Sequence, residues 1–196
     1  MLRSSRLHQC GVLLTTFAAV LALASASAQA QVKPFKITGG GLAPEGISLI
    51  PGVPAPHDAT GNATELGKYE GEGFFTLLGF TSQLTAEFAS APDFVFTAAN
   101  GDQLTFTYGD VDNGAAQPGQ VELFPQSDGS FIAVFVAEFN PDPSKSTGRF
   151  AKVVDGSFIM IAVSEPFTFD PNDPSRTTPF EYTWEGKGTL TFSKGK

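Results

Sequence analysis

The chain has 196 residues, with 12 Lys and Arg against 20 Asp and Glu and a net charge of −8. A chain this acidic repels phosphate backbones and has no basic stretch to offset the charge, so we expect no nucleic-acid partner. Its 19 Phe and 21 Gly suit short, aromatic-packed strands joined by tight turns.

Residues 1–30 have the pattern of a secretory signal peptide. Two arginines at positions 3 and 6 precede an apolar run from Gly11 to Leu23, and small residues at 26–28 or 28–30 offer a cleavage site. The run is too short to span a bilayer, and no later stretch reaches about 18 consecutive apolar residues. We therefore expect a secreted or periplasmic protein without a membrane span. Cleavage would remove Cys10, the only cysteine, and with it any disulfide, thiol nucleophile or cysteine metal site.

The next part of the chain, residues 31–62, is expected to form an N-terminal arm and loop after a short strand near Lys33–Thr38. The segment Gly39–Ala59 contains five Gly and four Pro, a composition that disfavours regular structure. His57 lies in this segment beside Asp58. We interpret it as a solvated loop histidine, because no nucleophile with its own orienting partners is evident.

From residue 63 onward, apolar and polar residues alternate with the period of a β-strand. Leu104, Phe106 and Tyr108 share one face of a predicted strand. The run Glu181–Ser193 alternates in the same way, with Gly186 and Gly188 expected to mark a bend or bulge. Further strands are expected around Leu66–Leu78, Leu84–Phe88, Phe94–Thr97, Gln120–Phe124, Ser130–Phe139, Phe150–Val154 and Ser157–Val163.

Four dipeptides between these runs are hairpin signals: Asn100-Gly101, Asn113-Gly114, Asp128-Gly129 and Asp155-Gly156. Their spacing predicts an all-β, antiparallel domain over residues 63–196. It closes into a β-barrel of approximately eight strands or folds into a sandwich. Closure is favoured, because long strands would otherwise leave exposed edges.

Two predicted strands are apolar on both faces. In Ser130–Phe139, Ile132, Val134 and Val136 lie opposite phenylalanines and alanines, and Ser157–Val163 has the same character. Such strands need cover on both sides, and the chain offers no helix for the outside. We therefore expect a homo-oligomer, a trimer, that associates through the outer faces of these two strands.

Three segments together resemble bacterial exported proteins related to the allene oxide cyclase and dirigent barrels. They are Ala63–Gly71, Ala98–Leu104, and Thr147–Phe150 followed by Asp155–Phe158. The resemblance implies an eight-stranded antiparallel barrel, commonly trimeric, whose hydrophobic cavity shapes the cyclisation or coupling of a small reactive ligand. It covers mainly turn glycines and strand residues, and it assigns no catalytic residue to this chain.

Four residues are candidates for ligand binding. Glu138 shares a strand face with Ile132, Val134 and Val136, and if that face lined the barrel, desolvation would make it an acid or base. Tyr108 and Tyr182 lie at the ends of apolar faces and could offer hydroxyls to a ligand, although packing alone also explains them. Glu72 is a weaker candidate.

We predict no metal site and no cofactor. The segment Asp110–Gly114 resembles the start of a calcium loop but lacks the later acidic ligand, so an ordinary turn is the better interpretation.

Two functions remain open at this point. The first is a secreted barrel that binds a small hydrophobic molecule in its lumen, with or without steering a cofactor-free cyclisation, isomerisation or coupling. The second is a non-catalytic extracellular structural or adhesion module whose lumen is filled by its own Phe side chains.

Overall fold

The computed structural model describes residues 30–194. The expected signal peptide, with Cys10, lies almost entirely outside these residues. The described chain is all-β, and its helical segments are two short 3-10 helices, η1 (Val111–Asn113) and η2 (Gly148–Lys152). The strands are β1 (Gln31–Ala43), β2 (Pro54–Ala63), β3 (Gly67–Phe80), β4 (Thr85–Ser90), β5 (Phe94–Ala98), β6 (Gln103–Tyr108), β7 (Gly119–Pro125), β8 (Phe131–Pro141), β9 (Val153–Ser164) and β10 (Phe180–Phe192).

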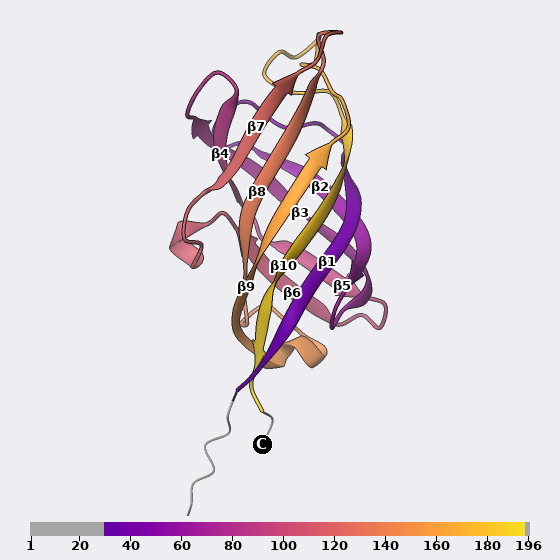
Figure 1. Ribbon diagram of the computed structural model, residues 1–196, viewed down its shortest axis with the longest axis vertical. Coiled ribbons are helices and arrows are strands. Elements are labelled where there is room, and N and C mark those ends of the chain that lie inside the picture. Colours follow the sequence, from indigo (N-terminus) through magenta and orange to yellow (C-terminus); the bar gives the residue numbers. More distant parts are fainter. Residues whose placement is uncertain (1–29, 195–196) are drawn as a thin grey trace, which may run out of the picture.

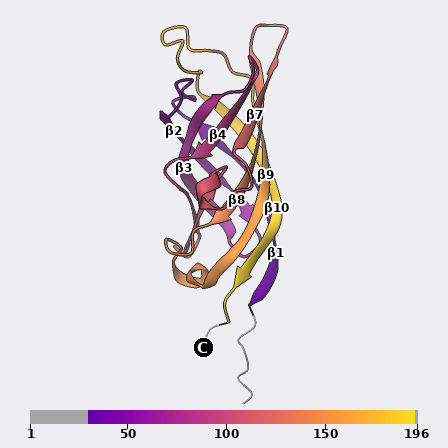
Figure 2. The ribbon, with the colours of Figure 1, turned by 90° about the vertical axis from the view of Figure 1, so that its left-hand side faces the viewer.

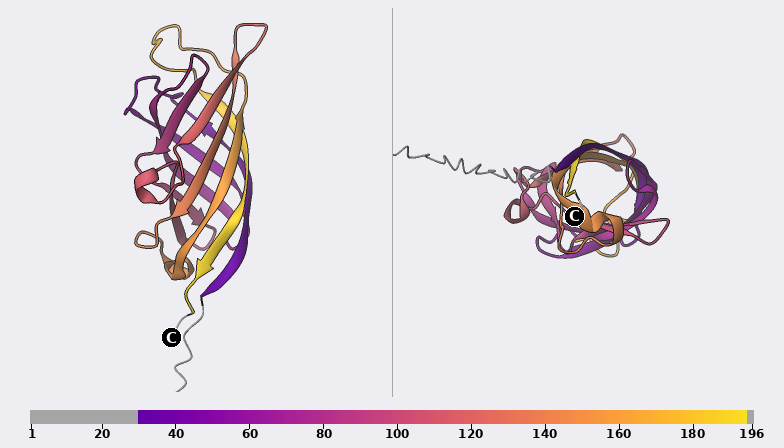
Figure 3. Two further views of the ribbon diagram at one scale, coloured as in Figure 1. Left: turned by 60° about the vertical axis from the view of Figure 1, so that its left-hand side comes forward. Right: turned by 90° about the horizontal axis from the view of Figure 1, so that it is seen from below.

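All ten strands belong to one antiparallel sheet, and eight of them close into a ring (Figure 1). The ring runs in the order β2-β1-β10-β9-β8-β6-β5-β3, and a pairing between β3 and β2 completes it. Figure 3 shows this ring from below, the end where β1 begins and β10 ends. Closure leaves few free strand edges, as the sequence analysis anticipated.

The two remaining strands, β4 and β7, close the upper half of the molecule. They pair with each other and join the upper parts of β3 and β8, whereas β5 and β6 join the lower parts of the same two strands. Figure 2 shows β3 and β4 on one side of the molecule, with β9, β10 and β1 on the other. The ring thus has two levels, with the end of β6 close to the boundary between them.

Strand alternation decides which side chains enter the ring. The lower level is filled by aromatic side chains, and each of these phenylalanines is at most 1% exposed: Phe35, Phe94, Phe96, Phe106, Phe139 and Phe158. Their rings are stacked, tilted or edge to face, with centroids 4.7–6.5 Å apart, which is the favoured range for aromatic pairs. The many phenylalanines of the sequence therefore form the core of the lower level.

The prediction of an N-terminal arm was wrong, because residues 31–43 and 54–63 form the ring strands β1 and β2. The glycines there make room for tyrosine side chains that cross the interior. A Cβ atom at Gly41 would lie 2.5 Å from the Tyr182 hydroxyl, and one at Gly39 would lie 2.5 Å from the Tyr69 hydroxyl. Glycine weakens a strand by itself but permits such close approach.

Three smaller expectations about residues 148–192 also need correction. The predicted strand at Phe150–Val154 begins within the 3-10 helix η2, whose first residue, Gly148, has a φ of +56°. Asp155-Gly156 lies within β9 and makes no hairpin, whereas Asn100-Gly101 and Asp128-Gly129 do connect successive strands. The register shift in β10 lies between Thr191 and Phe192, away from Gly186 and Gly188. A Cβ at either glycine would instead collide with β9.

The outer faces of β8 and β9 are apolar, as the sequence indicated. Ile159, Ile161 and Val163 are each more than 40% exposed, and Val136 and Val134 pair with the last two across the strands. Phe124 on β7 lies beside Ile132 at the upper end. We call these seven side chains the outer patch: Phe124, Ile132, Val134, Val136, Ile159, Ile161 and Val163.

Candidate functional site

Two prolines shape the ring wall around His57. Within the described residues, the pairing of β1 with β2 ends at Leu42 and Asp58, and residues 54–57 of β2 pair only with β3. Pro54 and Pro56 have no N–H to donate, so this stretch cannot form a complete ladder of backbone hydrogen bonds with a second neighbouring strand. Beyond it the connection 44–53 leaves the sheet. His57 consequently lies on a strand segment that borders a single neighbour.

The His57 side chain points into the ring and lies between two tyrosines. Its Nδ1 is 2.9 Å from the hydroxyl of Tyr182 and its Nε2 is 3.0 Å from the hydroxyl of Tyr108. The two hydroxyls also lie close to backbone carbonyl oxygens, with Tyr108 2.7 Å from that of Phe74 and Tyr182 2.6 Å from that of Asp58. We call these three side chains the His57 cluster.

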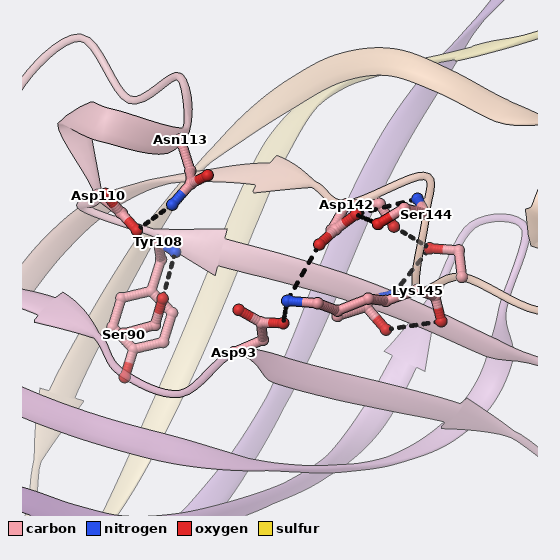
Figure 4. Close-up of polar contacts among 10 residues, drawn as sticks. Ser90, Asp93, Tyr108, Asp110, Asn113, Asp142, Ser144 and Lys145 are labelled. Atoms are coloured by element: carbon pink, nitrogen blue, oxygen red, sulfur yellow. Dashed lines mark hydrogen bonds and ion pairs between the residues drawn. The ribbon is translucent and has the colours of Figure 1, made fainter.

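Neighbouring elements hold the cluster in place. The Tyr108 ring stacks on Phe139 at 4.7 Å, and the His57 ring packs against Phe94 at 4.9 Å. The Tyr108 backbone N–H donates to the Ser90 hydroxyl at the end of β4, a contact drawn in Figure 4. This bond ties β6 to β4 where the two levels of the ring meet, so the cluster lies at that boundary.

Burial sets the protonation states of the cluster. It lowers the pKa of His57 to about 4, because an imidazolium would lose its hydration inside the ring. It raises the pKa of both Tyr108 and Tyr182 above the usual value. The Asp58 side chain points away and accepts a hydrogen bond from the Leu42 backbone N–H. At neutral pH the cluster is therefore uncharged.

A second buried polar pair lies farther down β10. The Trp184 Nε1–H donates to the Tyr69 hydroxyl at 2.7 Å, and that hydroxyl donates to the Thr38 carbonyl oxygen at 3.2 Å. The indole hydrogen of Trp184 and the hydroxyl hydrogen of Tyr69 each have one acceptor. Burial raises the pKa of Tyr69 to about 12. This pair is fully accounted for by packing and internal hydrogen bonds.

A cavity of about 50 Å³ adjoins the His57 cluster in the upper half of the ring. Its exposed wall is almost entirely apolar. Aromatic residues, alanines and aliphatic side chains form it together with the cluster: Ala43, Ile47, Ala55, Pro56, His57, Phe75, Phe88, Tyr108, Phe135, Met160, Ala162, Phe180, Tyr182 and Trp184. A site that is mostly apolar with a few placed polar groups is typical of small-molecule binding.

A second apolar hollow, of about 30 Å³, lies next to the first. Ile47, Phe75 and Phe135 line both, and the two phenylalanine rings meet edge to face with centroids 5.8 Å apart. Rotation of either ring would therefore change the space shared by the two hollows.

Two loops cover the upper end of the ring. The Leu49 backbone N–H donates to the Ser175 carbonyl oxygen at 2.7 Å, and the Thr177 N–H donates to that of Ile47 at 3.0 Å. The Ile47 N–H donates in turn to the Thr177 hydroxyl at 2.9 Å. These bonds hold the buried Ile47 side chain against both hollows.

The structure brings two of the four predicted candidates together and leaves the other two outside. Tyr108 and Tyr182 are both in the His57 cluster. Glu138 lies on the outer face of β8, where its carboxylate accepts a hydrogen bond from the Ala116 N–H at 2.9 Å, and Glu72 is exposed on β3. The premise for Glu138 was wrong, because the alanine and phenylalanine face of β8 is the one that enters the ring.

His57 is the site residue that sequence reasoning misassigned. The Pro-rich segment suggested a solvated loop, whereas the histidine is half-buried on a strand. One signal could have pointed to it. Ala55, His57, Ala59, Gly61 and Ala63 alternate with bulkier or polar residues, which is a strand pattern with a small-residue face.

The acidic loops of the described chain form hydrogen-bonded turns. Asp110 caps η1, and its Oδ1 accepts from the Asp112 N–H at 3.0 Å. Its Oδ2 accepts from the Asn113 side-chain amide at 2.7 Å, the contact drawn in Figure 4. In the same view Lys145 bonds Asp93 and Asp142. No group of three or more potential metal-ligating side chains occurs among residues 30–194. No helix in that range is long and apolar enough to cross a membrane.

Compared with protein-family models, curated proteins and solved structures, the chain has no match, so nothing identifies it with the allene oxide cyclase or dirigent-like superfamily.

Proposed function

We propose that the protein is an exported β-barrel that binds a small hydrophobic molecule inside its ring. The observation that carries this proposal is the apolar cavity beside three titratable side chains, the buried Tyr108 and Tyr182 and the half-buried His57. Perturbed groups of this kind gather at functional sites more often than elsewhere. The resemblance to allene oxide cyclase and dirigent barrels points the same way, and we retain it as part of the proposal.

The size of the cavity limits the ligand. About 50 Å³ is room for a few water-sized groups, since one water needs roughly 10–15 Å³ of such volume. A larger molecule would require Phe75 or Phe135 to rotate and join the two hollows. The ligand is therefore small, or it opens the site as it binds.

His57 is the group that would exchange a proton with a bound molecule if the site also steers a reaction. It is neutral at pH 7 and can accept a proton, whereas Glu138 and Glu72 lie on the outer surface. A cyclisation, isomerisation or coupling in this cavity would draw mainly on confinement and orientation.

One observation favours the second function, a structural or adhesion module. The lower level of the ring is filled by the protein's own phenylalanines, and little free volume remains above it. A filled barrel of this kind can serve as a rigid scaffold without a ligand.

We also propose that a second and third copy of the chain cover the outer patch. Val136, Ile159, Ile161 and Val163 in this patch are 38–48% exposed, and a contiguous exposed apolar patch often marks an interaction surface. Burial of this patch in a closed trimer would remove it from water.

The binding function is tested by native mass spectrometry of the exported protein, followed by titration with small apolar compounds. Ala162→Leu would fill the cavity, and Val163→Leu on the outer face of the same strand is the matched control. We expect retained or added ligand in the wild type and in Val163→Leu, and loss in Ala162→Leu. Equal behaviour of all three proteins would favour the structural module.

A further inference from the structure

The two apolar hollows lie in series between the upper end of the ring and the His57 cluster. The smaller one, here called the outer hollow, is lined by Phe80, Leu84 and Phe169, whose side chains are 39–49% exposed. It therefore opens to solvent between the end of β3, the start of β4 and loop 165–179, and we call these three side chains the mouth. The larger cavity lies deeper, against the His57 cluster and the buried Trp184.

Polar groups are available at the mouth but not deeper in the ring. Thr85 lines the outer hollow, and its hydroxyl lies 2.8 Å from that of Thr81 and 2.7 Å from that of Ser82, both exposed residues. The hydroxyls and ring nitrogens of the His57 cluster already lie 2.6–3.0 Å from one another or from backbone carbonyl oxygens. Among the described residues, no Asp, Glu, Lys or Arg lines either hollow. A ligand can therefore keep a polar group in water at the mouth, whereas one placed deeper would be buried without a partner, which is costly.

The free volume and the boundary between the hollows limit the shape of the ligand. Volumes of about 50 and 30 Å³ take roughly six water-sized groups in total, at about 10–15 Å³ each. Phe75 and Phe135 line both hollows at this boundary, with ring centroids 5.8 Å apart. A slender chain needs only these two rings to move, whereas a bulky skeleton would have to displace more of the close-packed wall.

We propose that the ligand is a single-chain amphiphile of about six carbons, bound with its chain across both hollows and its polar end in water at the mouth. This inference rests on the proposed binding function and names the class of molecule that the site takes. Burial of the chain supplies the affinity, at about fourfold for each methylene. A polar group at the far end of the chain would lie beside the internally paired His57 cluster and would lose its hydration without gaining a partner.

The first test compares hexane-1,2-diol with its isomer hexane-1,6-diol by isothermal titration calorimetry, with hexan-1-ol as the reference. The two diols have the same composition, but only the 1,2-isomer has both hydroxyls at one end. We expect hexane-1,2-diol to bind nearly as tightly as hexan-1-ol. Hexane-1,6-diol should bind at least about tenfold more weakly, because one of its hydroxyls must be buried.

Trp184 reports the orientation of the bound chain, because it is the only tryptophan and lines the deeper cavity. The probe is 6-bromohexan-1-ol, which has a bromine atom at the end opposite its hydroxyl. A heavy atom in contact with an indole ring quenches its fluorescence. We expect the bromo alcohol to quench Trp184 on binding and hexan-1-ol to leave its intensity nearly unchanged.

Two variants test the position of the mouth. Leu84→Asp places a charge beside the outer hollow, whereas Leu78→Asp makes the same change at a residue that is 46% exposed and lines neither hollow. Both leucines are exposed, so both variants should keep the fold. Leu84→Asp should weaken binding of hexan-1-ol about tenfold, and Leu78→Asp should leave it unchanged.

Failure of this inference and failure of the proposed function give different results. Equal binding of the two diols, or a bound bromo alcohol that does not quench Trp184, overturns the chain-first arrangement and leaves the apolar site standing. Equal affinity of Leu84→Asp and the wild type for hexan-1-ol does the same, as does binding of other small apolar compounds when none of these alcohols binds. Failure of every compound to bind rejects the proposed function together with this inference.

Discussion

The pH dependence of stability gives a direct test of the environment assigned to His57. Burial lowers its pKa to about 4 in the folded protein, whereas an unfolded chain has the ordinary value near 6.5. Between these two values the unfolded state binds a proton that the folded state refuses. The free energy of unfolding therefore falls as the pH drops from about 6.5 to about 4, and above 6.5 this contribution is constant.

The size of the effect follows from the same two values. One unit of pKa difference corresponds to about 1.4 kcal/mol, so at pH 5 the histidine alone should cost about 2 kcal/mol of stability relative to pH 8. The half-buried state of the residue makes this an upper value. His57→Gln removes the titrating group and should lose this component while keeping the carboxylate contributions common to both proteins.

The assay is urea unfolding at a series of pH values, followed by the fluorescence of Trp184, the only tryptophan. The quantity of interest is the wild-type stability minus that of His57→Gln at each pH. Parallel curves for the two proteins would show that the imidazole is solvated. A wild type that gains stability over the variant on acidification would show that hydrogen bonding to the imidazolium outweighs its burial.

Three further outcomes follow from the packing. Gly41→Ala would place a Cβ atom 1.8 Å from a carbonyl oxygen and should lower the stability by about 2–3 kcal/mol in thermal unfolding. Gly79→Ala, at a position with open space, should change the stability little. Phe96→Ala, at a fully buried position, should cost about 3–5 kcal/mol in urea titration, and the same change at the half-exposed Phe80 should stay within about 0.5 kcal/mol. Ile161→Lys in the outer patch should convert the proposed trimer into monomers in sedimentation velocity. A wild type that already sediments as a monomer at micromolar concentration would contradict the trimer proposal.

The strand content of the chain could be predicted because it depends on local patterns. Leu104, Phe106 and Tyr108 alternate with polar residues, and the structure places all three inside the ring. The Asn100-Gly101 and Asp128-Gly129 turns form as predicted, with both glycines at positive φ. Such signals need only the residues themselves and their nearest neighbours.

The candidate site could be predicted only in part. Tyr108 and Tyr182 were identified because each ends or begins an apolar strand face. Glu138 was misplaced because β8 is apolar on both faces, and nothing within the strand itself says which face enters the ring. That choice is made by the neighbouring strands, where Phe158 and Phe106 pack against Phe139.

The sequence by itself determined an all-β chain, the hairpins at Asn100-Gly101 and Asp128-Gly129 and the apolar character of both faces of β8 and β9. Tertiary structure alone decided that the Gly- and Pro-rich segment becomes β1 and β2. Its glycines suggest that regular structure is interrupted there. In the folded protein, tyrosine side chains from β3 and β10 occupy the space beside these glycines, which explains why glycine is present. The same holds for His57, whose hydrogen-bond partners lie 51 and 125 residues away in the sequence. Closure of the ring brings these positions together, and no local sequence pattern indicates that they are neighbours.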